Sequence, residues 1–182
     1  MAAAREIRDI RLRPACTSDR AAVAALLQAL GYLEGGGDDL AALLRETLHR
    51  PDMALFLAVA RDEPRGTALG LIGLSRRPQL QLGGTLVSID TLAVRADARG
   101  RGVGRRLMRR ARAYARLHRA VRIEVHTTRA RENYRRSFYP ANGYREANSA
   151  LFQYEIAHTT VRYDQAIADT APGAGDKARK GR

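Results

Sequence analysis

Cysteine is almost absent from this 182-residue chain, which contains only Cys16. A single cysteine excludes an intrachain disulfide, so a reducing compartment is the simplest setting and we expect a cytoplasmic protein. The histidines are also few, and none shares a zinc-ligand spacing with the cysteine or with another histidine. They are His49, His118, His126 and His158. We therefore expect no metal site.

Long apolar runs are missing too. No segment approaches the roughly eighteen apolar residues that cross a bilayer, and residues 1–9 lack the apolar stretch of a signal peptide. A hydrophobic content of 45% is nevertheless enough for one globular core. We expect a flexible N-terminus over residues 1–7, a single domain over residues 8–169, and a basic disordered tail over residues 170–182.

Acidic residues are scarce where basic residues are dense. The net charge is +13, and between Arg95 and Arg122 there are eleven arginines and one acid, Asp97. Such a field favours a polyanionic partner, which could be a phosphorylated cofactor, a nucleic acid or an acidic substrate; the alternative is a solvated arginine face. Aromatic residues make up only 5% and no nucleic-acid motif is present, so a basic nucleic-acid-binding module is the less favoured hypothesis.

Hydrophobic periodicity predicts a chain that alternates strands and helices. The expected strands are residues 10–12, 53–60, 69–74, 86–94, 121–127 and 144–156, with 160–167 as a further candidate. The expected helices are a first one capped by Thr17 or Ser18, a second from Asp38 to before Pro51, a long amphipathic one from Val103, and a last one over residues 131–141. A loop with Pro78, Gly83 and Gly84 should precede residue 86.

The order of these elements predicts an α/β (α+β) fold. A strand, a long helix and a strand over residues 86–127 form a right-handed crossover, so those two strands should be parallel. The earlier strands are joined by short turns and should be antiparallel. We therefore expect a mixed, mostly antiparallel sheet with helices on both faces.

A glycine-rich turn, Arg99-Gly100-Arg101-Gly102-Val103-Gly104, joins the strand over residues 86–94 to the long helix. The first amides of a helix have no internal partner and attract anions, and glycines let backbone approach a phosphate closely. The turn therefore suits a pyrophosphate. It has no P-loop lysine, and Arg105 stands where a dinucleotide fingerprint needs its third glycine.

This turn resembles the acyl-CoA signature [RQ]-x-x-G-x-[GA] of the GNAT (GCN5-related N-acetyltransferase) family. The stretch Ser137-Phe138-Tyr139-Pro140-Ala141-Asn142-Gly143-Tyr144 is similar to the family's F-Y-x-x-x-G-[FY] segment, and Arg11-Leu12-Arg13-Pro14-Ala15 to its first strand. The resemblance covers roughly residues 8–156. It implies a GNAT-type sheet with a splayed parallel pair, with acetyl-CoA as cosubstrate.

The resemblance also implies the cosubstrate contacts. The backbone of Leu92, Ala93 and Val94 would pair with the pantetheine arm as an added strand. The glycine turn would hold the pyrophosphate through Arg99, Gly100, Arg101, Gly102, Val103, Gly104 and Arg105.

Two catalytic roles follow from the same resemblance. Tyr139 matches the tyrosine that protonates the leaving thiolate; otherwise it is a core aromatic residue. Asp90 is the first candidate base; otherwise it is a buried hydrogen-bond acceptor. Glu124 and His126, two residues apart on the neighbouring strand, are the next candidates. Their alternative roles are an arginine partner for Glu124 and a core or rim histidine for His126. The family's asparagine position, seven residues before the tyrosine, is Glu132 here, so Asn133 is doubtful as a cofactor ligand.

The reaction implied is acetyl transfer to a primary amine of a small molecule or peptide, by direct attack in a ternary complex. The alternative is a regulatory domain that binds acyl-CoA without turnover. A homodimer is implied only by the resemblance. The amine is not readable, because the loops at residues 35–37 and 76–84 and the final strands, which would bind it, carry no motif.

Overall fold

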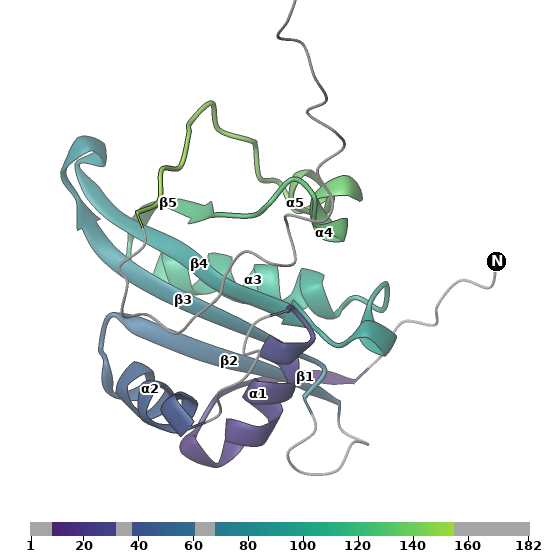
Figure 1. The fold of residues 1–182 in the computed structure, drawn as a ribbon. Helices are drawn as coiled ribbons and strands as arrows, with labels where there is room; N and C mark the ends of the chain where they lie inside the picture. The colour runs from purple at the N-terminus through teal and green to yellow at the C-terminus, as the bar shows by residue number, and fades with distance from the viewer. Residues whose placement is uncertain (1–8, 32–37, 61–67, 155–182) are drawn as a thin grey trace, which may run out of the picture. The chain divides into compact units, whose positions relative to one another are not determined.

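The computed structural model describes residues 9–31, 38–60 and 68–154, and the chain divides into two units, residues 1–127 and 128–182, each described by itself. The first unit contains one sheet in the order β1-β2-β3-β4-β5 (Figure 1). Its strands are β1 (Ile10–Pro14), β2 (Met53–Ala60), β3 (Gly70–Gln79), β4 (Gly84–Val94) and β5 (Ala120–Val125). Only β4 and β5 are parallel; the other neighbours are antiparallel. The mixed, mostly antiparallel sheet is thus confirmed.

Helices cover both faces of this sheet. They are α1 (Arg20–Gln28), α2 (Asp38–His49) and α3 (Val103–Leu117), with short 3-10 turns η1 (Thr17–Asp19), η2 (Leu80–Leu82) and η3 (Ala96–Ala98). Leu71 of β3 packs in an apolar cluster with Val23 and Leu26 of α1. The preceding Gly70 faces α3 instead, because a Cβ there would lie 3.0 Å from Val103 Cγ1. None of the helices in the described part of the chain has the length and hydropathy needed to span a bilayer.

The β3–β4 hairpin is longer than the sequence predicted. β3 continues through Pro78, which pairs with Thr85, to Gln79, and the turn is confined to residues 80–83. The pairing of β2 with β3 ends at Ser75, so Pro78 lies where β3 has a neighbour on one side only. Proline is tolerated at such edge positions because its missing N–H has no ladder partner to lose.

The start of α1 is anchored by a carboxylate rather than by a hydroxyl cap. Thr17 and Ser18 lie within η1, which corrects the prediction that one of them caps the helix. The buried Asp19 accepts hydrogen bonds from Nη2 and Nη1 of the Arg13 guanidinium, at 2.6 and 2.7 Å, and from the Cys16 amide at 2.8 Å. These bonds tie the end of β1 to the first helix.

The second unit differs most from the sequence prediction. The helix expected over residues 131–141 is two short helices, α4 (Glu132–Arg135) and α5 (Phe138–Ala141), separated at Ser137, whose φ of 53° is left-handed. The strand expected over residues 144–156 is absent from residues 144–154. The glycine joint at 35–37, the candidate strand at 160–167 and both expected flexible ends lie outside the described residues.

Candidate active site

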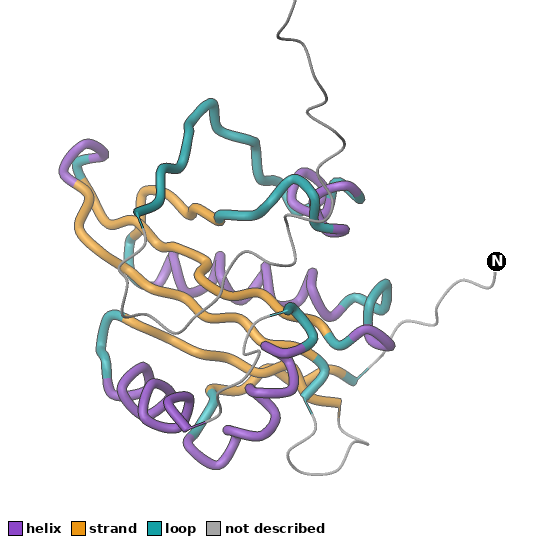
Figure 2. Tube along the Cα trace, viewed as in Figure 1, coloured by secondary structure: helices purple, strands orange, loops and turns teal. Residues whose placement is uncertain are grey.

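The feature that sets β4 apart is the difference between its two edges. On one side it pairs with β3 along its whole length, but on the other it pairs with β5 only from Thr85 to Ile89. Within the described residues of the first unit, no strand continues this ladder past Ile89, and the chain leaves β5 while β4 runs on (Figure 2). The segment 90–94 therefore has an open edge, which can accept an added extended chain.

A β-bulge lies where the two parallel strands separate. The register with β3 passes from Gly73↔Thr91 to Leu74↔Ile89, so Asp90 is the additional residue on β4. Bulges bend a strand and redirect a side chain, and they recur near functional sites. The backbone that would carry the thioester contacts, Leu92 to Val94, follows directly, with Ala93 buried and its two neighbours half-buried.

The pKa of the Asp90 carboxyl group is shifted by its surroundings. Although the residue is exposed, desolvation of its carboxyl group by nearby protein raises the pKa of Asp90 above its ordinary value. The proximity of the Ser75 side chain and electrostatic interactions with Arg77 and His126 oppose the rise in pKa. Arg77 also donates to the buried hydroxyl of Ser88 at 3.2 Å. The structure thus brings His126 and Asp90 within electrostatic reach of each other.

Glu124 lies on β5 opposite Ser88. Its carboxylate meets the Arg122 guanidinium at 3.4 Å in a partly exposed pair, which is the arginine-partner role weighed from the sequence. Glu124 is half-buried within β5, whereas His126 is exposed and lies just past the end of the strand at Val125, so the shared strand face expected for the two residues is not formed by β5.

The glycine turn has the backbone conformation that only glycine adopts readily. After η3 the chain passes Arg99 and reaches Gly100, with φ 72°, and Gly102, with φ 88°, before α3 begins at Val103. The first intrahelical hydrogen bond runs from the Arg106 amide to the Gly102 carbonyl at 3.1 Å. The amides of the turn before it are those that an α-helix cannot pair internally.

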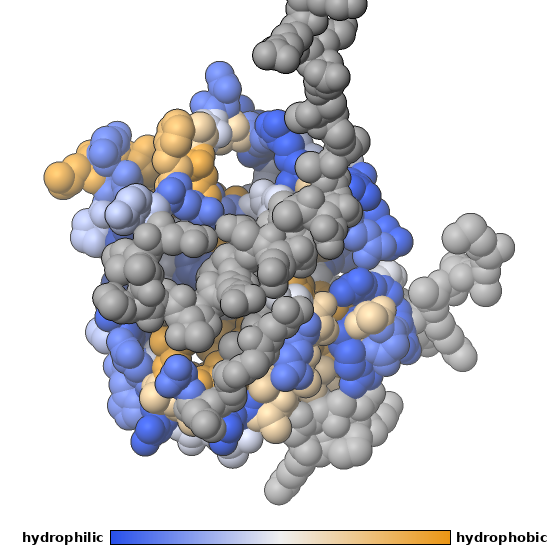
Figure 3. Space-filling model, in the orientation of Figure 1, coloured by the Kyte–Doolittle hydropathy of each residue, from blue (hydrophilic) through white to orange (hydrophobic). Residues whose placement is uncertain are grey.

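Positive side chains surround this turn. Arg99 Nε donates to the Val94 carbonyl at 3.3 Å, which links the turn to the end of β4, and Arg95 pairs with Asp97 at 2.7 Å. Arg101 is half-buried and Arg105 is exposed, while Gly104 lies inside α3 with an ordinary helical φ. The surface over η3 and the start of α3 is strongly hydrophilic (Figure 3). Helix dipole and arginines together favour an anion here.

Tyr139 belongs to the second unit and is held rigidly. Its side chain is 8% exposed, and its phenol oxygen accepts a hydrogen bond from Asn133 Nδ2 at 3.0 Å. Its backbone carbonyl accepts bonds from the amides of Asn142 and Tyr144, at 2.9 and 3.1 Å. The sequence did not predict the contact between Asn133 and Tyr139.

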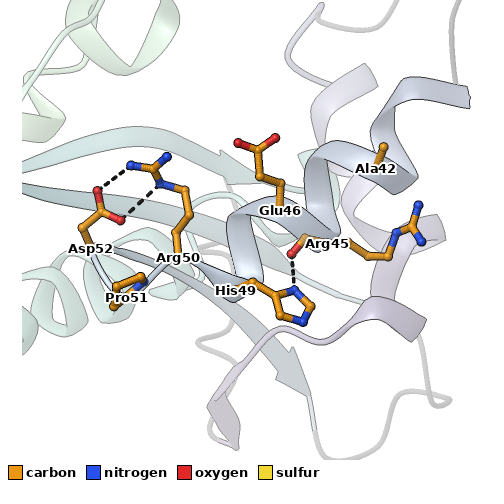
Figure 4. Close-up of a pocket in the computed structure, with 7 residues that line it drawn as sticks. All are labelled: Ala42, Arg45, Glu46, His49, Arg50, Pro51 and Asp52. Atoms are coloured by element: carbon orange, nitrogen blue, oxygen red, sulfur yellow. Dashed lines mark hydrogen bonds and ion pairs between the residues drawn. The ribbon is translucent and has the colours of Figure 1, made fainter.

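Two surface hollows lie beside α2. The larger, about 730 Å³, lies at the C-terminal end of α2 and contains the Arg50–Asp52 ion pair (Figure 4). It includes none of the predicted site residues. The smaller, about 220 Å³, extends from α2 to Met53 and Ser75. Ser75 lies close enough to Asp90 to lower the pKa of its carboxyl group, so the smaller hollow adjoins the candidate base. Among the described residues, no group of three or more histidine, cysteine or carboxylate side chains could hold a metal ion.

Comparison with solved structures shows the same fold. A transcriptional regulator from Bacillus halodurans C-125 is 18% identical, with a TM-score of 0.68 over 80% of this chain and 99% of the other. An aminoglycoside acetyltransferase from an uncultured soil metagenomic sample, in complex with trehalose, is 16% identical, with a TM-score of 0.69 over 81% and 96%. Glucosamine-6-phosphate N-acetyltransferase from Arabidopsis thaliana is 15% identical, with a TM-score of 0.68 over 81% and 99%.

The sequence itself matches no curated protein. It does match the family model described as "Acetyltransferase (GNAT) family" over residues 21–144, which is more than half of the chain and includes β4, the glycine turn and Tyr139. The fold agrees with that match, since the solved acetyltransferases superpose on about four fifths of the chain. The chain therefore belongs to the GNAT family of acetyltransferases.

Proposed function

We propose that this protein transfers the acetyl group of acetyl-CoA to a primary amine by direct attack in a ternary complex. One observation carries the proposal: the open edge of β4 at residues 90–94 is followed, after the short turn η3, by a turn of left-handed glycines that opens α3. Acetyl-CoA has an extended pantetheine arm that contains amides and ends at a diphosphate. The arm fits the strand edge, and the diphosphate fits the glycine turn. Family membership supports acetyl transfer as the reaction.

The cosubstrate contacts follow from this geometry. The backbone of Leu92, Ala93 and Val94 pairs with the pantetheine arm along the free edge of β4. The diphosphate lies at the start of α3, where the helix dipole and the surrounding arginines stabilise negative charge. The residues in that role are Arg99, Gly100, Arg101, Gly102, Val103, Gly104 and Arg105.

The chemistry needs a base, an oxyanion donor and an acid. Asp90 accepts a proton from the nitrogen of the acceptor, directly or through water, so that a neutral amine attacks; Glu124 is the second candidate for this role. The amine nitrogen bonds to the thioester carbonyl carbon, and a backbone N–H of residues 92–94 stabilises the oxyanion. The carbon–sulfur bond then breaks, and Tyr139 protonates the leaving thiolate of coenzyme A.

The amine has a candidate location beside Asp90. The smaller hollow lies between α2 and Ser75, on the side of the sheet that α1 and α2 cover. An acceptor amine in this hollow would approach Asp90 past Ser75. We place the acceptor amine at this hollow. The aminoglycoside and glucosamine-6-phosphate named for two solved structures provide starting compounds for assay.

Thiol release from acetyl-CoA tests the function. The full chain is incubated with acetyl-CoA and a panel of polyamines, amino acids, aminoglycosides, amino sugars and N-terminal peptides, with coenzyme A measured by a thiol reagent. We expect at least one amine to increase thiol release well above hydrolysis. If acetyl-CoA raises the melting temperature but no amine releases thiol, the protein is a non-catalytic acyl-CoA-binding regulator instead.

A further inference from the structure

The contact between Asn133 and Tyr139 exists only because the chain is not one continuous helix. Residues six apart on an α-helix are rotated by about 240° and lie on different sides. Here α4 ends at Arg135, Ser137 adopts φ 53° and ψ 33°, and α5 begins at Phe138. The break returns the Tyr139 ring to Asn133, so that Nδ2 and the phenol oxygen lie 3.0 Å apart.

The break is held in place by several hydrogen bonds. A left-handed conformation is unfavourable at a residue other than glycine and persists only when its surroundings enforce it. The Ser137 amide donates to the Tyr134 carbonyl at 2.9 Å, and the Ala141 amide donates to the Ser137 carbonyl at 3.0 Å. Asn142 Nδ2 donates to the Phe138 carbonyl at 2.8 Å. The placement of Tyr139 is therefore built into the second unit.

The direction of the hydrogen bond matters for an acid. An amide NH₂ can only donate, so the phenol oxygen of Tyr139 is the acceptor and its own proton can be given to a different group. With the amide reversed, Asn133 Oδ1 would accept that proton. The reverse orientation would also put the two N–H groups where the structure has Oδ1, a buried atom without a hydrogen-bond partner in the described residues. Two unpaired donors would cost more than one unpaired acceptor.

We propose that Asn133 is a positioning residue for catalysis: it donates to the Tyr139 phenol oxygen and fixes the ring, so that Tyr139 acts as a proton donor and not as an acceptor. The inference rests on the proposed function of Tyr139 as the acid. Donation by the amide also stabilises the phenolate that remains after proton transfer. No covalent bond to Asn133 forms, and the proton that leaves Tyr139 is the one that coenzyme A gains.

Three variants of the full chain test this inference: Asn133→Leu, Asn133→Asp and Tyr139→Phe. Loss of one hydrogen bond to the phenol should lower kcat about 3–10-fold in Asn133→Leu, with the KM for acetyl-CoA little changed. The high-pH limb of the kcat profile should move up by about 0.5–1 pH unit, since the phenolate has lost its donor. Asn133→Asp should be worse than Asn133→Leu, because a carboxylate can only accept and captures the phenol proton.

A second readout does not need turnover. The ultraviolet absorbance of tyrosinate is titrated for each protein, and subtraction of the Tyr139→Phe curve isolates Tyr139 from the other six tyrosines. Ionisation of Tyr139 should occur at higher pH in both Asn133 variants than in the wild type. Asn148→Leu is the matched control, because Asn148 is an exposed asparagine of the same unit that takes no part in the break. It should move neither pH curve.

The outcomes separate the two proposals. If Asn133→Asp keeps wild-type kcat and pH limb, the asparagine acts as an acceptor and the inference is overturned. Unchanged pH curves in Asn133→Leu would overturn it as well. If Tyr139→Phe retains full thiol release, Tyr139 is not the acid and the inference falls with that role, whereas acetyl transfer itself stands.

Discussion

Asp90 is the residue where the geometry of the site and the electrostatics coincide. It lies at the bulge where β4 and β5 separate, and crowding raises the pKa of its carboxyl group. A carboxylate whose ionised form is destabilised by its surroundings binds a proton more readily and is therefore a better base. The same destabilisation of the ionised form lowers the stability of the folded protein at neutral pH. The sequence could place Asp90 on the strand, but it could not show the bulge, because the register of two strands is not encoded at one position.

The variant Asp90→Asn should therefore lose activity but not stability. We expect turnover to fall by about 10²–10⁴-fold, the range for loss of a general base. The raised pKa means that the stability contributed by Asp90 is present below the ordinary pKa of 3.8 and is lost as the pH rises through the folded-state value. At pH 7 urea unfolding should thus show equal or higher stability for Asp90→Asn. Parallel loss of turnover and stability would instead make Asp90 a structural hydrogen-bond acceptor.

Asp19 shows the opposite behaviour. The hydrogen bonds from Arg13, the largest contribution, lower the pKa of Asp19 to about 2 from 3.8. The stability it adds is present above pH 3.8 and is lost as the pH falls through about 2. Asp19→Asn should lower the free energy of unfolding at pH 7 by about 1–2 kcal/mol, reduced from the full linkage value because the Arg13 side chain is 30% exposed.

Urea unfolding of Asp19→Asn at pH 7 and near pH 2 checks this prediction, because the difference from wild type should shrink at the lower pH. Asp52→Asn is the control, since Asp52 pairs with Arg50 in an exposed ion pair and its loss should matter far less. An Asp19→Asn effect at pH 7 no larger than that of Asp52→Asn would contradict the role given to burial.

At the scale of elements, apolar patterning was a good guide in the first unit and a poor one in the second. The continuous apolar run of β2 and the amphipathic stripe of α3 predict their elements because burial decides them. The two short helices of the second unit depend on one left-handed serine and a few hydrogen bonds, and no periodic pattern marks these. The sequence also could not predict the cation–π contact of Arg110 with Phe56, at 4.1 Å, because nothing distinguishes Arg110 from the other arginines of α3.

Close packing of α3 on the sheet depends on Gly70. A Cβ at this position would lie 2.7 Å from the Ala93 carbonyl oxygen and 3.0 Å from Val103 Cγ1. Gly70→Ala therefore forces β4 and the start of α3 away from β3. We expect a loss of about 1–3 kcal/mol in unfolding free energy, together with weaker acetyl-CoA binding. Gly73→Ala is the matched control on the same strand, because its Cβ would meet neighbours at 3.4 Å or more. Equal stability of the two variants would contradict the packing argument.

At the scale of the whole molecule, charge is the property that the sequence conveyed most directly. The chain carries 32 lysines and arginines against 19 acids, and the arginines of α3 begin at the proposed diphosphate site. The sequence did not indicate where the chain divides into two units. That division depends on contacts between residues far apart in the chain, whereas the charge of the glycine turn is a local property. The sequence also does not identify the acceptor amine.

Ionic strength should therefore weaken the proposed cosubstrate interaction. We expect the KM for acetyl-CoA to rise several-fold between 50 mM and 500 mM NaCl, because salt screens exposed charges over about 10 Å at 0.1 M and over less at higher concentration. The KM for S-acetylpantetheine, which has no phosphate, should change little. Equal salt dependence of the two substrates in steady-state kinetics would show that the arginine field does not act on the phosphates.

The central claim is that the glycine turn at the start of α3 holds the diphosphate of coenzyme A, and calorimetric titration of acetyl-CoA into Gly102→Asp and Gly102→Asn tests it most directly. Gly102 has φ 88°, a region that asparagine and aspartate enter more readily than other residues with a side chain, and the two variants have nearly the same shape and differ mainly by one negative charge. We expect Gly102→Asp to bind at least about tenfold more weakly than Gly102→Asn, with both folded. Equal affinities for the two variants, or no heat of binding in the wild-type protein, would contradict the account.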